Sequence, residues 1–486
     1  MLEVRTAEFK LEAGQGSIAT ERSWDVAVIG GGNAALVAAI SASQFSNSVL
    51  LVERAPSNMR GGNSRHTRNI RCVHRNGDAF YTGAYEYDEF WKDLCSIGTG
   101  PSNESLAALT VKSSESMPQW MSEQGINWQT PLNGTLHLGR TNRFFLGGGK
   151  ALLNAYYRTA QARGVTVAYD ACVEELELQG DMCSGLIVSV AGVRRKIAAK
   201  SVICASGGYE ANIDWLSRYW GEAAQNYIIR GTPYNDGRIL QRLYDLGVDR
   251  AGAQRGFHAV AVDARSPRFD GGIATRLDCI PFGIVVNRYA RRFYDEGEEV
   301  SPKRYAIWGR NIADQDDQIA YAVWDAKVSR AFLPPMYPPV TGDTLGRVAE
   351  KLHLPASDFV EEVTSFNQSI RPGGRFDPTI LDGCHTEGLT VPKSNWAQPI
   401  DTPPYYGIAM RPGITFTYMG VAIDEAARVR FRDGSPAANI FAAGEIMSGN
   451  ILSSGYLAGF GMTIGSVWGR IAGVNAVKHA HDPASR

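Results

Sequence analysis

Short apolar runs alternate with longer amphipathic stretches along this chain, and the first pair of runs shows the pattern most clearly. Residues 25–29 (DVAVI) form a β-branched run that leads into three glycines, and NAALVAAISASQ then has helical composition. A second apolar run, SVLLVE, covers 48–53. Buried parallel strands are nearly continuous hydrophobic runs, and their alternation with helices indicates a parallel sheet. The start of the chain therefore predicts a strand–helix–strand unit.

Two further predicted strands lie far downstream, and both run into glycine turns. They are KSVICASGGYEAN at 200–212 and ANIFAAGEIMSGN at 438–450, and GYLAGFGMTIGSVWGRIAG at 455–473 then opens a helix from a glycine-rich loop. Glycine turns at strand ends let a ligand approach the backbone closely. We therefore predict that both ends of the chain build one dinucleotide-binding lobe, interrupted by an insertion.

The turn after the first strand has the chemistry of a dinucleotide site. Gly30, Gly32 and Ala35 meet the pattern G-x-G-x-x-A. The first glycine permits the turn, the second lets a pyrophosphate approach, and the small third residue seats the helix on the sheet. The helix N-terminus supplies N–H donors for the phosphates. Glu53 ends the second strand, where an acid accepts hydrogen bonds from a ribose hydroxyl.

Composition narrows the class of protein. The chain has 486 residues, of which 44% are apolar and 20% charged, so it is long enough for two lobes. A formal net charge of −1 argues against nucleic acid as a partner. Seven scattered cysteines without a C-x-x-C pair exclude common zinc, haem and iron–sulfur motifs, and we expect no metal site. No apolar run reaches the ~18 residues of a membrane span, and residues 1–23 lack an apolar signal segment, so we expect a cytoplasmic protein.

One strongly basic segment stands out against this balanced charge. RGGNSRHTRNIRCVHR, residues 60–75, holds five arginines and two histidines. Arginine suits carboxylates because its planar fork donates two parallel charge-assisted hydrogen bonds. The segment therefore favours a small polyanion as ligand, although some of its arginines could instead bind a pyrophosphate or lie solvated on the surface. The candidate substrate-binding residues are Arg65, His66, Arg68 and Arg71.

A set of motifs spread over residues 30–465 resembles the fumarate reductase/succinate dehydrogenase flavoprotein superfamily, most closely its members that oxidise tricarballylate. The resemblance implies an α/β fold, with a Rossmann-type FAD-binding lobe at 1–257 and 399–486 that is interrupted by an α+β capping domain at 258–398. The motifs are GGGNAAL, RGGNSRHTRNIRC, GTPYNDGR, FDGGIATRLDCIPFGIVVN, RRFYDEGE, KRYAIWGR, RPGITFTYMGV and FAAGEIMSGNIL with GYLAGFGMTIG.

The resemblance also implies which residues hold FAD. Ser64 stands where some members carry the histidine that binds FAD covalently, so non-covalent FAD is expected. The implied cofactor-binding residues are Gly30, Gly32, Asn33, Ala34, Glu53, Arg54, Gly62, Asn63, Ser64, Val173, Ala205, Gly207, Asp236, Gly237, Gly444, Glu445, Gly461 and Met462.

For the reacting end, the resemblance implies oxidation of a saturated C–C bond beside carboxylates, with tricarballylate converted to cis-aconitate. A hydride would pass to FAD N5, and a proton to Arg304 with help from Asp295 or Glu296. A substrate histidine and an arginine of the superfamily are replaced by Phe416 and Tyr456. The implied catalytic set is His258, Thr275, Arg276, Arg304 and Tyr456.

Three alternatives stay open at this point. Tyr456 before a glycine-rich helix also resembles 3-ketosteroid Δ1-dehydrogenases, although an arginine excess suits a steroid poorly. The substrate could be another di- or tricarboxylate or a corrin polycarboxylate, and a non-catalytic flavin-binding subunit is a third reading. In an enzyme of this kind, the resemblance implies a separate, membrane-associated electron-transfer protein as partner.

Overall fold

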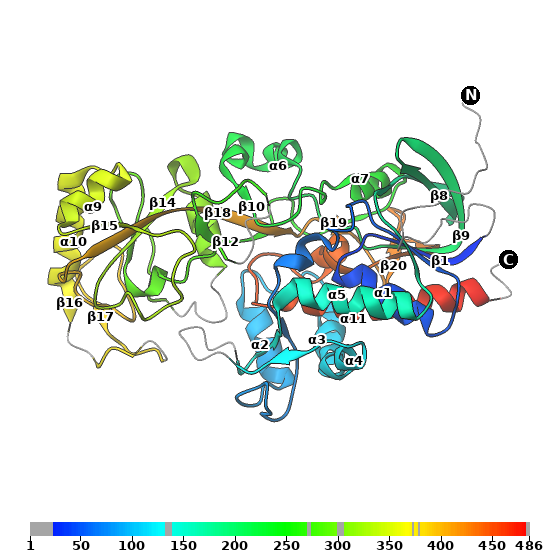
Figure 1. Ribbon diagram of the computed structural model, residues 1–486, viewed down its shortest axis with the longest axis horizontal. Helices are drawn as coiled ribbons and strands as arrows, with labels where there is room; N and C mark the ends of the chain where they lie inside the picture. The colour runs from blue at the N-terminus through cyan, green and yellow to red at the C-terminus, as the bar shows by residue number, and fades with distance from the viewer. Residues whose placement is uncertain are drawn as a thin grey trace.

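The structure is a computed structural model of the chain, and it describes residues 23–131, 139–269, 274–298, 306–371, 374–377 and 380–482. Two lobes lie end to end in an elongated molecule (Figure 1). The first, here called the dinucleotide lobe, contains an eight-stranded sheet, and the second, here called the cap, is built around a six-stranded sheet. The long strand β18 (Tyr405–Thr417) runs from the cap back to the dinucleotide lobe.

The dinucleotide lobe has the parallel strand–helix–strand sheet that the sequence predicts. β1 (Trp24–Ile29) pairs in parallel with β2 (Val49–Val52) and β9 (Val193–Cys204), and β9 pairs in parallel with β21 (Pro436–Ala442). Strands from both ends of the chain therefore share one sheet, which confirms the predicted α/β class. The remaining strands are β6 (Thr166–Ala168), β7 (Ala171–Gln179), β8 (Met182–Val190) and β20 (Arg428–Arg430).

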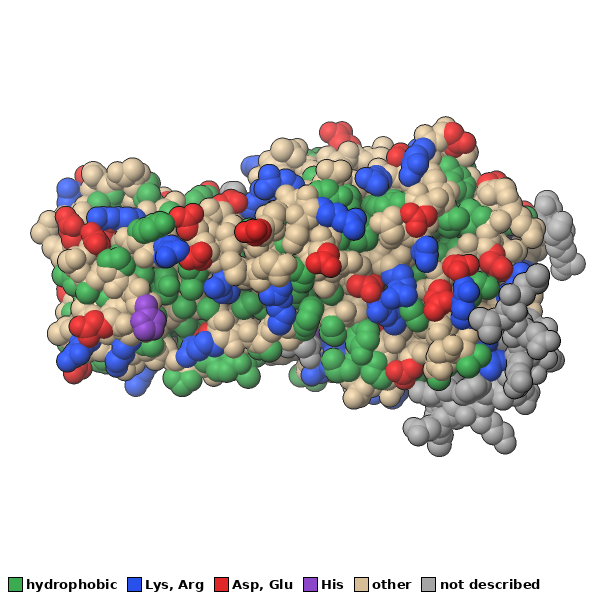
Figure 2. Space-filling model, turned by 90° about the horizontal axis from the view of Figure 1, so that it is seen from above, with side chains coloured by type: hydrophobic (Ala, Val, Ile, Leu, Met, Phe, Trp, Pro, Cys, Tyr) green, Lys and Arg blue, Asp and Glu red, His purple; other side chains and the backbone are tan. Residues whose placement is uncertain are grey.

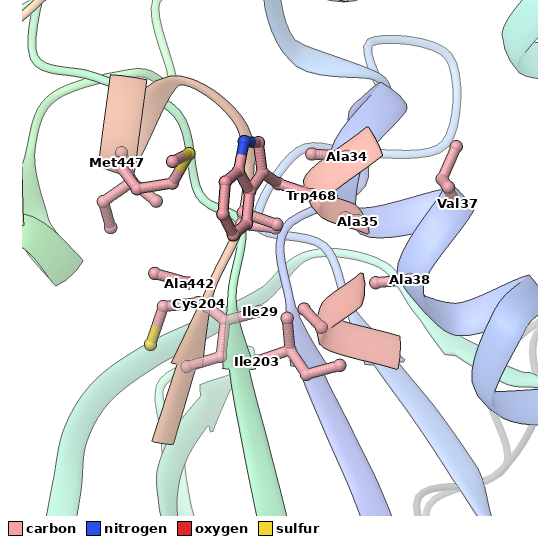
Figure 3. Packing of buried hydrophobic residues seen from close by; sticks show 14 of the residues in the cluster. Ile29, Ala34, Ala35, Val37, Ala38, Ile203, Cys204, Ala442, Met447 and Trp468 are labelled. Carbon is pink, nitrogen blue, oxygen red and sulfur yellow. The ribbon is translucent and has the colours of Figure 1, made fainter. Parts of the chain in front are cut away.

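Two helices cover this sheet and pack on each other at very short range. They are α1 (Asn33–Ser43) and α11 (Phe460–His481), and Figure 3 shows Trp468 of α11 beside the small residues of α1. A Cβ at Gly469 would lie 2.7 Å from the carbonyl oxygen of Ala34, and one at Gly473 would lie 2.4 Å from that of Ala38. The four-residue glycine spacing in IGSVWGRIAG thus lets the C-terminal helix lie directly on the first helix.

A subdomain of short elements extends the dinucleotide lobe. Phe90 and Leu94 of the amphipathic helix α2 (Tyr87–Ser96) are buried against the lobe. The other members are β3 (Asn69–Arg71), β4 (Trp128–Gln129) and β5 (Asn142–Phe145), with α3 (Glu104–Ser113), α4 (Met117–Glu123) and α5 (Gly148–Ala162).

The cap has its own hydrophobic cores on the two faces of a mainly antiparallel sheet. β12 (Phe257–Asp263) carries the chain into the cap near the predicted boundary, and β18 carries it out. The other strands are β10 (Ile228–Ile229), β13 (Ile284–Val286), β14 (Ala320–Asp325) and β15 (Val340–Gly342), and the helices are α8 (Ile307–Ala313), α9 (Leu345–Leu352) and α10 (Ala356–Ser369).

The remaining elements are short and connect these layers. They are α6 (Ile213–Trp220), α7 (Arg238–Asp245), β11 (Arg250–Ala251), β16 (Ile370–Arg371), β17 (His385–Thr386) and β19 (Gly420–Val421). On the face seen in Figure 2, acidic and basic side chains are interspersed along the whole length. Among the described residues, no helix is both long and apolar enough to cross a membrane.

Candidate functional site

A continuous cleft runs across the dinucleotide lobe, past the C-terminal ends of β1, β2 and β9, to the start of the cap. It encloses about 1510 Å³ of empty space, part of it open to solvent. Every predicted cofactor-binding residue lines it: Gly30, Gly32, Asn33, Ala34, Glu53, Arg54, Gly62, Asn63, Ser64, Val173, Ala205, Gly207, Asp236, Gly237, Gly444, Glu445, Gly461 and Met462.

The glycine turn at residues 30–32, here called the phosphate turn, is shaped for a phosphate. Gly30 has φ +114°, and a Cβ there would lie 2.4 Å from the carbonyl oxygen of Ala205, so only glycine fits. Gly32 is the N-cap of α1 and supplies no side chain to the first N–H groups of the helix. The N–H of Asn33 donates to Ser64 Oγ at 3.0 Å. These oriented donors suit a pyrophosphate at the helix N-terminus.

Glu53 is held in place at the far end of the cleft. It is 6% exposed, and its two carboxylate oxygens accept hydrogen bonds from the backbone N–H groups of Ala55 at 2.9 Å and Gly61 at 3.3 Å. Burial raises the pKa of this carboxyl above its ordinary value. Nearby, Arg54 pairs with Asp236 at 2.5 Å. A rigid acid beside the phosphate turn is the arrangement that binds a ribose hydroxyl, so this half of the cleft fits FAD.

The other end of the cleft gathers cationic and aromatic side chains from both lobes. Five of the predicted residues line it: His66, Arg68, His258, Arg276 and Tyr456. Phe416, which the resemblance places where the superfamily carries a histidine, lines it as well.

Arg230 is a lining residue that the sequence interpretation missed. It is 6% exposed and donates to Thr415 Oγ1 at 3.1 Å and to the carbonyl oxygen of His66 at 3.3 Å. Arg230 directly follows β10 and directly precedes the quoted motif GTPYNDGR. Its position next to that motif is the sequence signal that could have identified Arg230 as a candidate site residue.

His258 is neutral in this setting. Burial, followed by the positive charges of Arg230 and Arg276, holds its pKa well below the ordinary value of 6.5. Its ring stacks on Tyr456 with centroids 3.7 Å apart and planes 8° from parallel. The Tyr456 hydroxyl accepts the N–H of Gly461 at 3.0 Å, and the Phe416 ring lies 6.1 Å from the Tyr456 ring. This wall of the cleft is therefore aromatic and carries no full charge.

Two further predicted catalytic residues differ in their relation to the cleft. Arg276 pairs with Asp278 at 2.5 Å, and this carboxylate offsets part of its charge. Thr275 is buried, its carbonyl oxygen accepts the N–H of Asp263 at 2.9 Å, and it does not line the cleft. Arg304 lies outside the described residues.

The two carboxylates expected to assist Arg304 already have other partners. Glu296 accepts hydrogen bonds from the Arg292 guanidinium at 3.0 and 2.6 Å. Asp295 accepts the Ser394 N–H at 3.0 Å and the Gly297 N–H at 2.8 Å. Both side chains therefore brace loops of the cap.

Two members of the basic segment lie outside the cleft. Arg71 is fully buried, and its guanidinium donates to the carbonyl oxygen of Ala458 at 2.9 Å and to the Tyr85 hydroxyl at 2.8 Å. Arg65 donates to the carbonyl oxygen of Asn58 at 3.3 Å. The structure thus brings Arg68 to the cleft, whereas Arg71 anchors the loop that carries Tyr456. No cluster of His, Cys, Asp or Glu among the described residues could hold a metal ion.

Comparisons with known proteins agree with this geometry. The family model described as FAD binding domain matches residues 25–459. The chain is 26% identical to NADH:fumarate oxidoreductase of Klebsiella pneumoniae (strain 342), over 96% of this chain but only 49% of that protein. It is 25% identical to 4-oxocyclohexanecarboxylate 2-dehydrogenase of Sinomonas cyclohexanicum over 92% of each chain.

A solved structure shows the same fold. It is the open conformation of a flavocytochrome c3 fumarate reductase, which has a TM-score of 0.73 and 22% sequence identity. The match covers 95% of this chain and 79% of that one.

Proposed function

The chain belongs to the FAD binding domain family and is an FAD-dependent oxidoreductase, and from this premise we propose that it oxidises a saturated carbon–carbon bond next to carboxylate groups. The observation that carries the proposal is the placement of Arg68, Arg230 and Arg276 in the same cleft as the phosphate turn. Bound FAD would supply the acceptor for the two electrons removed. We further propose that FAD is held without a covalent bond, because Ser64 has only a hydroxyl to offer.

The arginines have a clear task in such a reaction. A carboxylate that leaves water for a buried site needs a charged partner to offset its desolvation. Removing a proton from the carbon next to a carboxylate also builds up negative charge, which fixed guanidinium groups stabilise. Neutral His258 can orient a carboxylate through its N–H but holds no positive charge itself. The first substrate to test is tricarballylate, with oxidation to cis-aconitate, and Arg304 as proton acceptor belongs to the same proposal.

A second candidate is a cyclic oxo acid, and the aromatic wall favours it. A flat ring could lie against Tyr456 and Phe416 while its carboxylate reaches the arginines. The relative from Sinomonas cyclohexanicum is named for such a compound, 4-oxocyclohexanecarboxylate. This candidate keeps the arginines in the same role and changes only the neutral part of the substrate.

An anaerobic titration of the FAD-loaded protein tests both candidates. Bleaching of the flavin absorbance is followed with tricarballylate, succinate, citrate, 4-oxocyclohexanecarboxylate and androstenedione. We expect tricarballylate to bleach the flavin, and bleaching by the oxo acid alone would select the second candidate. Bleaching by androstenedione alone, or by none of the carboxylates, would refute the proposal.

Arg230→Gln tests directly whether Arg230 binds a carboxylate of the substrate. Loss of one charge-assisted hydrogen bond costs about 1.5–3 kcal/mol, so the substrate concentration for half-bleaching should rise about tenfold or more. The matched control is Arg75→Gln, because Arg75 belongs to the basic segment but is exposed and pairs with Glu115. Unchanged half-bleaching in Arg230→Gln, with FAD still bound, would remove Arg230 from the site.

Electrons must leave the reduced protein, and for this we propose a separate, membrane-associated electron-transfer protein as partner. The protein itself would act in the cytoplasm. The measurement is reoxidation of the substrate-reduced protein by a soluble quinone analogue, compared with its reoxidation by oxygen. Faster reoxidation by the quinone analogue would indicate transfer to another electron carrier, whereas faster reoxidation by oxygen would indicate direct oxidation.

A further inference from the structure

Two buried glutamates meet behind the middle of the cleft. Glu210 follows the glycine turn at the end of β9, and Glu445 follows β21 and lines the cleft. Glu210 is 0% exposed and Glu445 is 9% exposed, and the Thr417 hydroxyl lies within reach of both, 3.5 Å from Glu210 Oε2 and 3.2 Å from Glu445 Oε1. Among the residues that the structure describes, neither carboxyl forms an ion pair with a cation. Two neighbouring carboxylates in such a setting cannot both be ionised at neutral pH.

The hydrogen bonds around the pair distinguish its two members. Asn63 and Asn235 both donate to Glu210 Oε1, the second at 2.8 Å. Glu445 Oε1 accepts the N–H of Thr417 at 2.8 Å and its hydroxyl at 3.2 Å. Four neutral donors thus surround the two neighbouring acids. A carboxylate that accepts two amide N–H groups is well stabilised as an anion, which assigns the charge to Glu210 and the proton to Glu445.

The pair also joins segments that are far apart in the sequence. Asn63 comes from the turn after β2, Asn235 from the loop before α7, and Thr417 from the end of β18. Asn63 and Asn235 line the cleft together with Glu445. A Cβ at Gly208 would lie 2.3 Å from Glu445 Oε1 and 2.8 Å from Glu210 Oε2, so the turn needs glycine there to admit both acids. The two glutamates therefore fix the relative positions of three walls of the cleft.

We propose that Glu210 and Glu445 share a single proton and that this singly protonated pair is a positioning element on which tight FAD binding depends. With the proton in place, the pair presents a neutral Glu445 to the cleft and keeps the only charge behind it, on Glu210. Loss of the proton would put a second negative charge on the wall of a site for an anionic dinucleotide. It would also set two like charges against each other, which would push the three walls apart.

Other charged groups near the pair have their own partners or lie across a neighbouring strand. Asp236, next to Asn235, pairs with Arg54, and Arg230 donates to Thr415, two residues before Thr417. On the neighbouring segments, burial raises the pKa of the Tyr209 and Tyr418 hydroxyls. Burial and the adjacent Glu210 likewise raise the pKa of Glu445 well above its ordinary value. Of these acids, Glu445 is the one whose ionisation would bring a new charge to the cleft wall.

Infrared spectroscopy tests the shared proton without any turnover. A protonated carboxylic acid has a carbonyl stretching band that ionised carboxylates lack. We expect this band at neutral pH in the wild-type protein and its loss in Glu445→Gln. We also expect its loss in Glu210→Gln, because Glu445 beside a neutral amide would ionise. Glu222→Gln, an exposed change on the same lobe, is the matched control and should leave the band in place.

FAD binding to the apo-protein supplies the second readout. The dissociation constant of the wild type should rise by about tenfold for each pH unit above the ionisation of the pair. Glu445→Gln keeps a donor toward Glu210 and an acceptor toward Thr417, so its dissociation constant should stay flat over the same alkaline range. Glu210→Gln moves the charge to the cleft wall, so its FAD binding should already be weak at neutral pH.

Either of two results would overturn the proposal. A carboxylic acid band that persists in Glu210→Gln would mean that Glu445 is protonated on its own account. Equal alkaline weakening of FAD binding in the wild type and in Glu445→Gln would mean that another group controls the pH dependence. If Glu210→Gln does not fold, as judged by circular dichroism, the comparison of the wild type with Glu445→Gln still tests whether the pair controls the pH dependence of FAD binding.

Discussion

At the scale of single residues, His258 shows how burial and neighbouring charge set a protonation state. Burial, Arg230 and Arg276 all hold its pKa well below 6.5. The unfolded chain takes up a proton at this histidine below pH 6.5 and the folded chain does not, so acidification destabilises the fold. His258→Gln should therefore reduce the loss of unfolding free energy between pH 6.5 and about pH 5 by up to about 1.4 kcal/mol per pH unit.

Urea denaturation over this pH range measures the effect. His353→Asn serves as the control, because His353 is exposed and its left-handed backbone suits asparagine. An identical pH slope in wild type and His258→Gln would show that His258 is protonated in the native state.

The residues expected to bind FAD all line the cleft, whereas only part of the expected substrate-binding set does, and strand geometry explains the difference. Gly30 and Glu53 sit at the ends of strands whose pattern is local. Arg71, in contrast, shares one face of β3 with Asn69, and that face meets the loop at Ala458. No local pattern reveals a contact between segments so far apart in the chain. Arg230 was missed for a related reason, since its strand has only two residues.

At the scale of elements, the α1–α11 contact is the packing on which the phosphate turn depends. Gly473→Ala would place a methyl group 2.4 Å from the carbonyl oxygen of Ala38, so the helices would have to separate. Overpacking of this kind costs about 1–3 kcal/mol. Because α1 begins at the phosphate turn, we also expect weaker FAD retention, measured by ultrafiltration alongside thermal unfolding.

Gly346→Ala in α9 is the matched control, since the nearest atom to its Cβ would be 4.0 Å away. This change should be neutral or stabilise the protein by up to about 1 kcal/mol, because alanine favours helices over glycine. Equal effects of the two substitutions would contradict the proposed close packing.

At the scale of the whole molecule, the basic segment that stood out in the sequence does not form one surface. Arg68 lines the cleft, Arg71 is buried beneath the C-terminal loop, and Arg75 is exposed beside Glu115. Arg60 stacks on the Tyr157 ring at 4.2 Å. The sequence shows this charge as one segment, and only the fold shows that the segment divides its arginines among several environments.

Because the hydrophobic cores are separated into two lobes, we expect FAD binding to protect one lobe from hydrogen exchange more than the other. A ligand that binds only the folded protein stabilises it by mass action, and local protection from hydrogen exchange follows the parts that it holds together. The cleft residues belong mainly to the dinucleotide lobe, whereas α10 packs in a separate core of the cap. Adding FAD to the apo-protein should therefore slow exchange around residues 30–34, 205–210 and 443–447 and leave 356–369 unchanged. Mass spectrometry measures this exchange. Equal protection of α10 would show instead that FAD binding alone makes the cap part of the same cooperative unit.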